Sequence, residues 1–165
     1  HPILILLLPF LSGLLIPIFS SRLGEKTAKI GILAHAASFL LSVFFLYDVS
    51  SQPPIDISFF PTTLGDGPIF RFGVYIDRLA AVMMVLITGV SSIIHIFSKN
   101  YLHQDIGHTR FFTLLSFITF TLLCLVSSPN LFMLFVFWQL ISWLLYLLLS
   151  YNYEHHPTIK AKMIV

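Results

Sequence analysis

One apolar stretch of the chain carries side chains that could act on protons or cations. Between Leu131 and Leu149 there is no charged residue, and the polar side chains are Gln139, Ser142 and Tyr146. Their spacing of three and four residues places them on one helix face, together with Trp143. A polar stripe on a helix in lipid normally faces protein or a water-filled path. The stripe is therefore a candidate lining of an ion path, and we expect Gln139 to face the protein interior.

Histidine is the second kind of residue here that could move protons. His95 lies late in another apolar stretch, and an imidazole titrates close to physiological pH, so a proton relay is one interpretation. The alternative is a hydrogen bond between helices. For His35 we favour such a bond, because no partner stands near it in the sequence. The polar loop from Lys99 to Arg110 offers no third ligand beside its histidines, so we expect no metal site and no catalytic residue.

Two charged residues open the stretch that contains His95. Asp77 is placed to cap a helix, since a carboxylate accepts the first backbone N–H groups and suits the positive end of the helix dipole. A basic group on a neighbouring span could also pair with it. Arg78 can extend its charged end to the membrane interface. Both are predicted to serve structure.

The composition decides the class of protein that must position these residues. Of 165 residues, 57% are hydrophobic and 10% are charged, which is typical of a membrane protein. The Leu131–Leu149 stretch, at about 1.5 Å per residue, crosses a hydrocarbon core of roughly 30 Å. Membrane lipids are thus expected partners, whereas a net charge of +2 gives no reason to expect nucleic acid.

The hydropathy pattern predicts an all-α polytopic protein with five complete transmembrane helices and the start of a sixth. The sixth would begin at Thr158, so we expect the chain, residues 1–165, to be the truncated N-terminal part of one transmembrane domain. The five predicted spans are Pro2–Ser20, Ala28–Tyr47, Asp77–Ser98, Phe111–Ser127 and Leu131–Leu149.

The longest segment without helical pattern, residues 48–76, predicts a short β-hairpin over one membrane face. Asp56–Phe60 and Ile69–Tyr75 are rich in strand-forming residues and flank a Gly65–Pro68 turn. This segment holds three aspartates against Arg71, whereas basic residues gather after the first, third and fifth spans. By the positive-inside rule the N-terminus and the hairpin are extracytoplasmic.

Three separated runs carry a resemblance to a known family. They are DRLAAVMMVLITGVSSIIHIFSKNYL from Asp77, then TRFF, then SPNLFMLFVFWQLISWLLYLLLSYNY. Together they resemble the antiporter-like membrane subunits of respiratory complex I (chain L) and the large subunit of Mrp cation/proton antiporters. The resemblance covers a little under half of the chain and includes a matching histidine at His95.

One position departs from the family pattern. Its proton-pumping members have a glutamate after the tryptophan of the fifth span, whereas Gln139 follows Trp138 here. An amide keeps the hydrogen-bonding ability but cannot release a proton. This departure, with Arg78, resembles the branch that forms the membrane subunit of two-component inorganic-carbon (DAB-type) transporters. Members of that branch pair with a zinc-containing, carbonic-anhydrase-like subunit.

The resemblance implies a proton- or cation-conducting subunit that energises CO2/bicarbonate uptake with such a partner, in a bacterial inner membrane. One alternative is a proton-translocating chain L of NADH-quinone oxidoreductase or an Mrp subunit. Another is a structural membrane scaffold that conducts no ion. No dinucleotide fingerprint, flavin motif or nucleophile–base pair is present, so we expect no cofactor and no catalytic site in this chain.

Overall fold

The structure is a computed structural model that describes residues 2–23, 26–49, 53–62, 70–101 and 107–154. The predicted sixth helix and the turn at residues 65–68 lie outside these residues. Within the described ranges there are five helices, each long and apolar enough to cross a membrane, which confirms the predicted spans to within a few residues. They are α1 (Pro2–Leu23), α2 (Thr27–Val49), α3 (Arg78–Tyr101), α4 (His108–Val126) and α5 (Leu131–Glu154).

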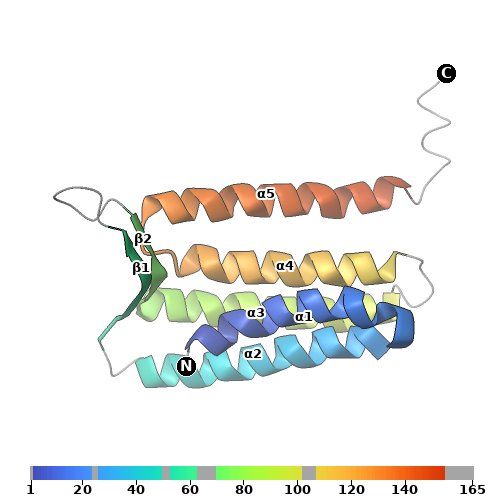
Figure 1. Cartoon of the computed structure of the whole chain (residues 1–165). Coiled ribbons are helices and arrows are strands. Elements are labelled where there is room, and N and C mark those ends of the chain that lie inside the picture. The colour runs from blue at the N-terminus through green and yellow to red at the C-terminus, as the bar shows by residue number, and fades with distance from the viewer. Residues whose placement is uncertain (1, 24–25, 50–52, 63–69, 102–106, 155–165) are drawn as a thin grey trace.

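Helices α1 to α4 form an antiparallel bundle, and α5 lies outside it along α4 (Figure 1). In the bundle α1 packs on α2 and α4, and α3 packs on the same two helices. The short connection of residues 127–130 makes α4 and α5 antiparallel neighbours. The face of α5 that points away from α4 is therefore left uncovered by the described part of the chain.

The distribution of polarity in the bundle is the reverse of that in a water-soluble protein. Leu33 and Phe44 of α2 are 69% and 73% exposed, whereas His35 and Ser38 of the same helix are completely buried. Large apolar side chains on the outside are stable only when hydrocarbon surrounds them. This chain is thus a multi-pass membrane protein, with its small polar groups turned inward.

A two-stranded antiparallel sheet covers one end of the bundle, as predicted. Strand β1 (Ile55–Thr62) pairs with β2 (Phe70–Ile76), and a bulge at Phe59 interrupts the register. Gly73 permits the close approach of the strands there, since a Cβ atom would collide with the carbonyl oxygen of Ile57. The N–H of Tyr75 donates to the carbonyl of Ser127 at 2.9 Å, which joins the hairpin to the α4–α5 connection.

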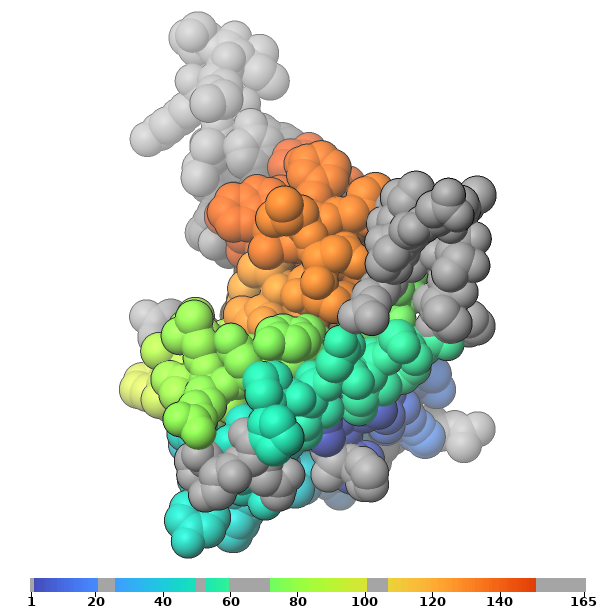
Figure 2. Space-filling view, turned by 90° about the vertical axis from the view of Figure 1, so that its left-hand side faces the viewer, coloured from blue at the N-terminus to red at the C-terminus, as the bar shows by residue number. Residues whose placement is uncertain are grey.

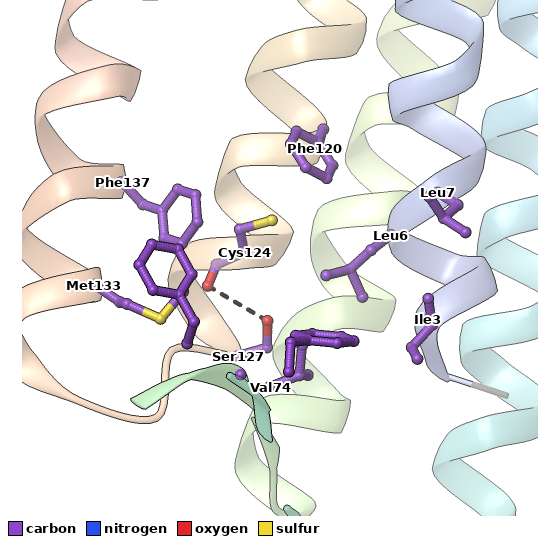
Figure 3. Close-up of a pocket in the computed structure, with 12 residues that line it drawn as sticks. Ile3, Leu6, Leu7, Val74, Phe120, Cys124, Ser127, Met133 and Phe137 are labelled. Atoms are coloured by element: carbon purple, nitrogen blue, oxygen red, sulfur yellow. Dashed lines mark hydrogen bonds between the residues drawn. The ribbon is translucent and has the colours of Figure 1, made fainter. Parts of the chain in front are cut away.

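Beneath the hairpin lies an apolar cavity of about 230 Å³ (Figure 3). Leu6 of α1, Phe120 and Cys124 of α4, Val74 of β2 and Phe137 of α5 all contribute to its wall. Val74 and Ile76 of β2 belong to the same buried apolar cluster as Leu6 and Cys124, so the hairpin packs on the bundle through apolar side chains.

Two side-chain caps set the helix starts at this end. The Asp77 Oδ1 atom accepts the N–H of Ala80 at 2.7 Å, which confirms the predicted cap of α3. Its pairing with a basic group stays a prediction, and Arg78 beside it is exposed. Asn130 caps α5 in the same way by accepting the N–H of Met133 at 2.9 Å. This second cap was not among the features predicted from the sequence.

Candidate functional site

The rings of His35 and His95 stack on each other inside the bundle. Their centroids are 3.7 Å apart with an interplanar angle of 27°, and both side chains are completely buried. Gly31 of α2 makes this close contact possible, because an added Cβ atom would lie 3.2 Å from Cδ2 of His95. The predicted hydrogen bond from His35 to another helix is not observed among the residues that the structure describes. The ring bonds within α2 and stacks on α3 instead.

The backbone fixes which nitrogen of each ring carries a proton. The Nδ1 atoms of His35 and His95 lie 2.8 Å from the carbonyl oxygens of Gly31 and Ser91, one helical turn earlier. A carbonyl oxygen can only accept, so both Nδ1 atoms donate, and in the neutral rings both Nε2 atoms are acceptors.

The two Nε2 atoms differ in what they contact. That of His95 lies 3.4 Å from the hydroxyl of Ser116 on α4, which can donate to it. That of His35 has no hydrogen-bond partner among the residues that the structure describes. A buried acceptor without a partner is costly, and in native proteins it usually marks a water, an ion or a functional role.

Hydroxyl groups continue from the histidines toward the hairpin. The Ser91 and Thr119 hydroxyls lie 2.6 Å apart between α3 and α4, and the Ser42 and Thr88 hydroxyls lie 2.9 Å apart between α2 and α3. Thr119 also donates to its own helix at Leu115, so the Ser91 hydroxyl is the donor in the first pair. We call this set the hydroxyl–imidazole seam; it comprises His35, Ser42, Thr88, Ser91, His95, Ser116 and Thr119.

The histidine end of the seam lies far from the hairpin. His35 is two turns into α2, and His95 is within two turns of the end of α3, which runs the opposite way (Figure 1). Phe112 is completely buried and separates His95 from His108 at the start of α4, with ring centroids 5.6 Å and 4.6 Å from them. A buried aromatic ring therefore lies at the end of the seam that is predicted to be nearer the cytoplasm.

The other predicted path residues do not join the seam. Gln139, Ser142 and Tyr146 are exposed on α5, and Tyr146 is 67% exposed. We expected Gln139 to face the protein interior, but it does not face α1 to α4. The face of α5 that contacts α4 is the one opposite to Gln139. The Ser142 hydroxyl donates to the Trp138 carbonyl of its own helix at 3.1 Å. The stripe can face protein only if a segment beyond the described residues, or a partner, covers it.

The seam lacks the side chains of a metal centre. Across the described ranges, no group of three or more His, Cys, Asp or Glu side chains comes together. Two stacked imidazoles with hydroxyl neighbours are suited to holding and passing protons.

Comparison with known proteins places these residues in a family. Residues 67–112 match the model of the N-terminus of NADH-ubiquinone oxidoreductase (complex I) chain 5. The chain is 33% identical over 155 residues, 94% of its length, to a probable inorganic carbon transporter subunit DabB1 of Halothiobacillus neapolitanus. It is also 33% identical, over an alignment of 169 residues that covers 96% of this chain, to NADH-quinone oxidoreductase subunit L of Rickettsia bellii. The chain belongs to the family of antiporter-like membrane subunits.

These two antiporter-like relatives are much longer than this chain, which spans 27% of the first and 25% of the second. A chloroplast NAD(P)H-quinone oxidoreductase subunit 5 of Ceratophyllum demersum is also 33% identical over 150 residues, which are 91% of this chain and 20% of that protein. The segment matching the family model includes the α3 half of the seam and Phe112. The α2 half, with His35 and Ser42, lies outside it.

Proposed function

We propose that this chain is part of a membrane subunit that conducts protons or cations across a bacterial cell membrane. The observation that carries the proposal is the stacked His35–His95 pair, buried between spans and continued by hydroxyl pairs. Family membership supports it. Side chains that can both donate and accept are those needed to pass a proton through a low-dielectric interior.

The unpartnered Nε2 atom of His35 supports a route for protons over a purely structural packing of rings. It can accept a proton or a water hydrogen without breaking any hydrogen bond of the described residues. The other seam groups bridge helices: the Ser42–Thr88 pair joins α2 to α3, and the contacts of Ser91 and His95 join α3 to α4.

For the whole protein, we propose that this conduction energises CO2/bicarbonate uptake together with a zinc-containing, carbonic-anhydrase-like partner subunit. Gln139 favours this role, since it stands where proton-pumping members of the family have a glutamate and cannot itself release a proton. The relative named as an inorganic carbon transporter subunit is consistent with it.

A second candidate is a subunit of a proton-translocating NADH-quinone oxidoreductase. It is favoured by the relatives with that name, whose identity to this chain is 31% to 33%, against 33% for the inorganic carbon transporter subunit. Copurification distinguishes the two, because the first candidate brings down one zinc-containing subunit and the second brings down many redox subunits.

The test uses the whole protein with its partner in cells, assayed for ion-driven uptake of inorganic carbon. His95→Gln should lower the rate by roughly tenfold or more, as expected when a proton-transfer group is lost. His108→Gln, a histidine outside the stack, is the matched control and should remain near the wild-type rate. Full activity of His95→Gln in correctly assembled protein would leave the structural scaffold as the better interpretation.

A further inference from the structure

Two cavities follow one another along the boundary between α3 and α4, lined by successive turns of both helices, and we call this line of cavities the groove. The first, of about 430 Å³, is at the hairpin end between α3, α4 and the start of α5, and Tyr75, Asp77 and Trp138 help to line it. Figure 2 looks onto this end, where the start of α3 (light green) lies beside the start of α5 (orange). The second, of about 200 Å³, lies deeper between α3 and α4 and is lined in part by Leu86 and Val90.

The outer cavity has the chemistry of a site for a positive group. Asp77 contributes a carboxylate, and none of the described residues that line the cavity is basic. Tyr75 and Trp138 are 39% and 60% exposed, so their rings are accessible beside the carboxylate. Aromatic faces next to an acid are a common environment for an ammonium group.

The inner cavity has the chemistry of a site for hydrocarbon. Its wall is aliphatic apart from Ser91 and Thr119, and their hydroxyls are already bonded to each other at 2.6 Å. A polar ligand would find no unsatisfied partner there, whereas an acyl chain needs none.

The near end of the inner cavity lies within the reach of one lipid. Leu86 is nine residues beyond Asp77, which corresponds to about 14 Å along the helix, and one leaflet of the hydrocarbon core is roughly 15 Å deep. A headgroup at Asp77 therefore places its acyl chain along Met83 and Leu86 and into the start of the inner cavity.

We infer that this groove binds one phospholipid from the leaflet on the hairpin side, with an ammonium headgroup at Asp77 and one acyl chain between α3 and α4. The site does not depend on the ion that the protein conducts. A transmembrane helix from elsewhere in the protein is the competing occupant.

The headgroup is tested by native mass spectrometry of the full-length protein from nanodiscs that contain equal amounts of phosphatidylethanolamine and phosphatidylglycerol. We expect phosphatidylethanolamine to be retained in roughly threefold excess, the size of effect of an accessible ion pair aided by aromatic rings. Asp77→Asn keeps the helix cap, because Asn caps as well as Asp, but removes the charge and should abolish the preference. Asp48→Asn, on α2 and outside the groove, is the control and should leave it unchanged. Equal retention by the wild type, or a preference that survives Asp77→Asn, would overturn the proposal.

The acyl chain is tested separately. Val90→Phe fills the inner cavity and should reduce retention of both lipids, whereas Ile93→Phe, on the same helix but outside the cavity, should not. A photo-reactive phenylalanine at Leu86 identifies the occupant directly. We expect an adduct with the mass of a phospholipid, and an adduct with another protein segment would refute the inference in favour of a helix.

Discussion

At the scale of single residues, the seam includes a close contact at Gly31. Gly31 lies against His95 on one side and against Ile16 on the other, where an added Cβ would be 3.2 Å and 3.3 Å from their nearest atoms. Side chains in a packed interior yield only by moving into less favourable rotamers. The absence of a side chain at Gly31 therefore favours the close approach of α2 and α3 at this depth.

Replacing Gly31 with Ala should separate the two rings and destabilise the protein by about 1–3 kcal/mol, the usual effect of overpacking. Thermal unfolding of the purified protein in detergent is the measurement. Leu33→Ala, on the lipid-facing side of α2, is the control and should have a much smaller effect. A Gly31→Ala protein as stable as the wild type would show that the stack has room to adjust.

The two histidines should respond differently when each is replaced by phenylalanine. His35→Phe keeps a stacking ring and removes the unpaired Nε2 atom, so its stability should remain within about 1 kcal/mol of the wild type. His95→Phe leaves the Ser116 hydroxyl without its acceptor and should cost about 1–3 kcal/mol. Equal losses in thermal unfolding would contradict the asymmetry of their hydrogen bonds.

At the scale of helices, the two caps hold α3 and α5 to the hairpin end. Asp77→Ala should cost about 1 kcal/mol by removing the acceptor for the Ala80 N–H, whereas Asp77→Asn should be nearly neutral. Asn130→Ala should give a loss of similar size, since the bond to Met133 is equivalent. Unfolding midpoints of the three variants provide the comparison. A loss in Asp77→Asn as large as in Asp77→Ala would assign Asp77 an ionic role instead of a capping one.

The uncovered stripe on α5 gives a second prediction at this scale. If Gln139 orients water on a wet path formed with segments beyond the described residues, Gln139→Leu should impair ion-driven uptake while assembly survives. Leu140→Ala, a change at an exposed apolar position on the same helix, is the control for assembly. Uptake measured in cells, with the amount of assembled complex from the same membranes, separates the two effects. Normal uptake in Gln139→Leu would show that the stripe only joins helices.

At the scale of the whole molecule, the distribution of basic residues predicts which end of the bundle faces the cytoplasm. Cys124 is the single cysteine and is buried, so a Cys124→Ser protein provides a background for accessibility labelling. A cysteine at Asp56 should react with a membrane-impermeant maleimide in intact cells, whereas one at Thr109 should react only after the cells are opened. The opposite pattern would reverse the orientation, placing the hairpin and the N-terminus in the cytoplasm.

The sequence predicts those parts of this molecule that local pattern determines. The five spans follow from hydropathy, the hairpin from its strand-forming residues and turn, and the α3 cap from Asp77 at a helix start. The stack could not be predicted in this way, because His35 and His95 are sixty residues apart and meet only when α2 and α3 are at one depth. One signal was available. His35 lies about two turns from the start of its span and His95 about two turns from the end of its own, so in antiparallel neighbouring spans the two histidines lie at a similar depth. The exposure of Gln139 depends on how α5 is placed against α4, and no local sequence pattern specifies this placement.

The bond from Tyr75 to Ser127 also has a consequence for how the protein is made. The hairpin is synthesised before α4, so when it first reaches its side of the membrane the carbonyl that accepts the Tyr75 N–H does not yet exist. That carbonyl arrives only with the short connection that follows α4. The bond from the hairpin to the α4–α5 connection can therefore form only after α4 has been synthesised. We expect this attachment to be a late step of biogenesis, so the hairpin of a chain stalled before Ser127 should be cleaved by proteases more readily than that of the finished protein.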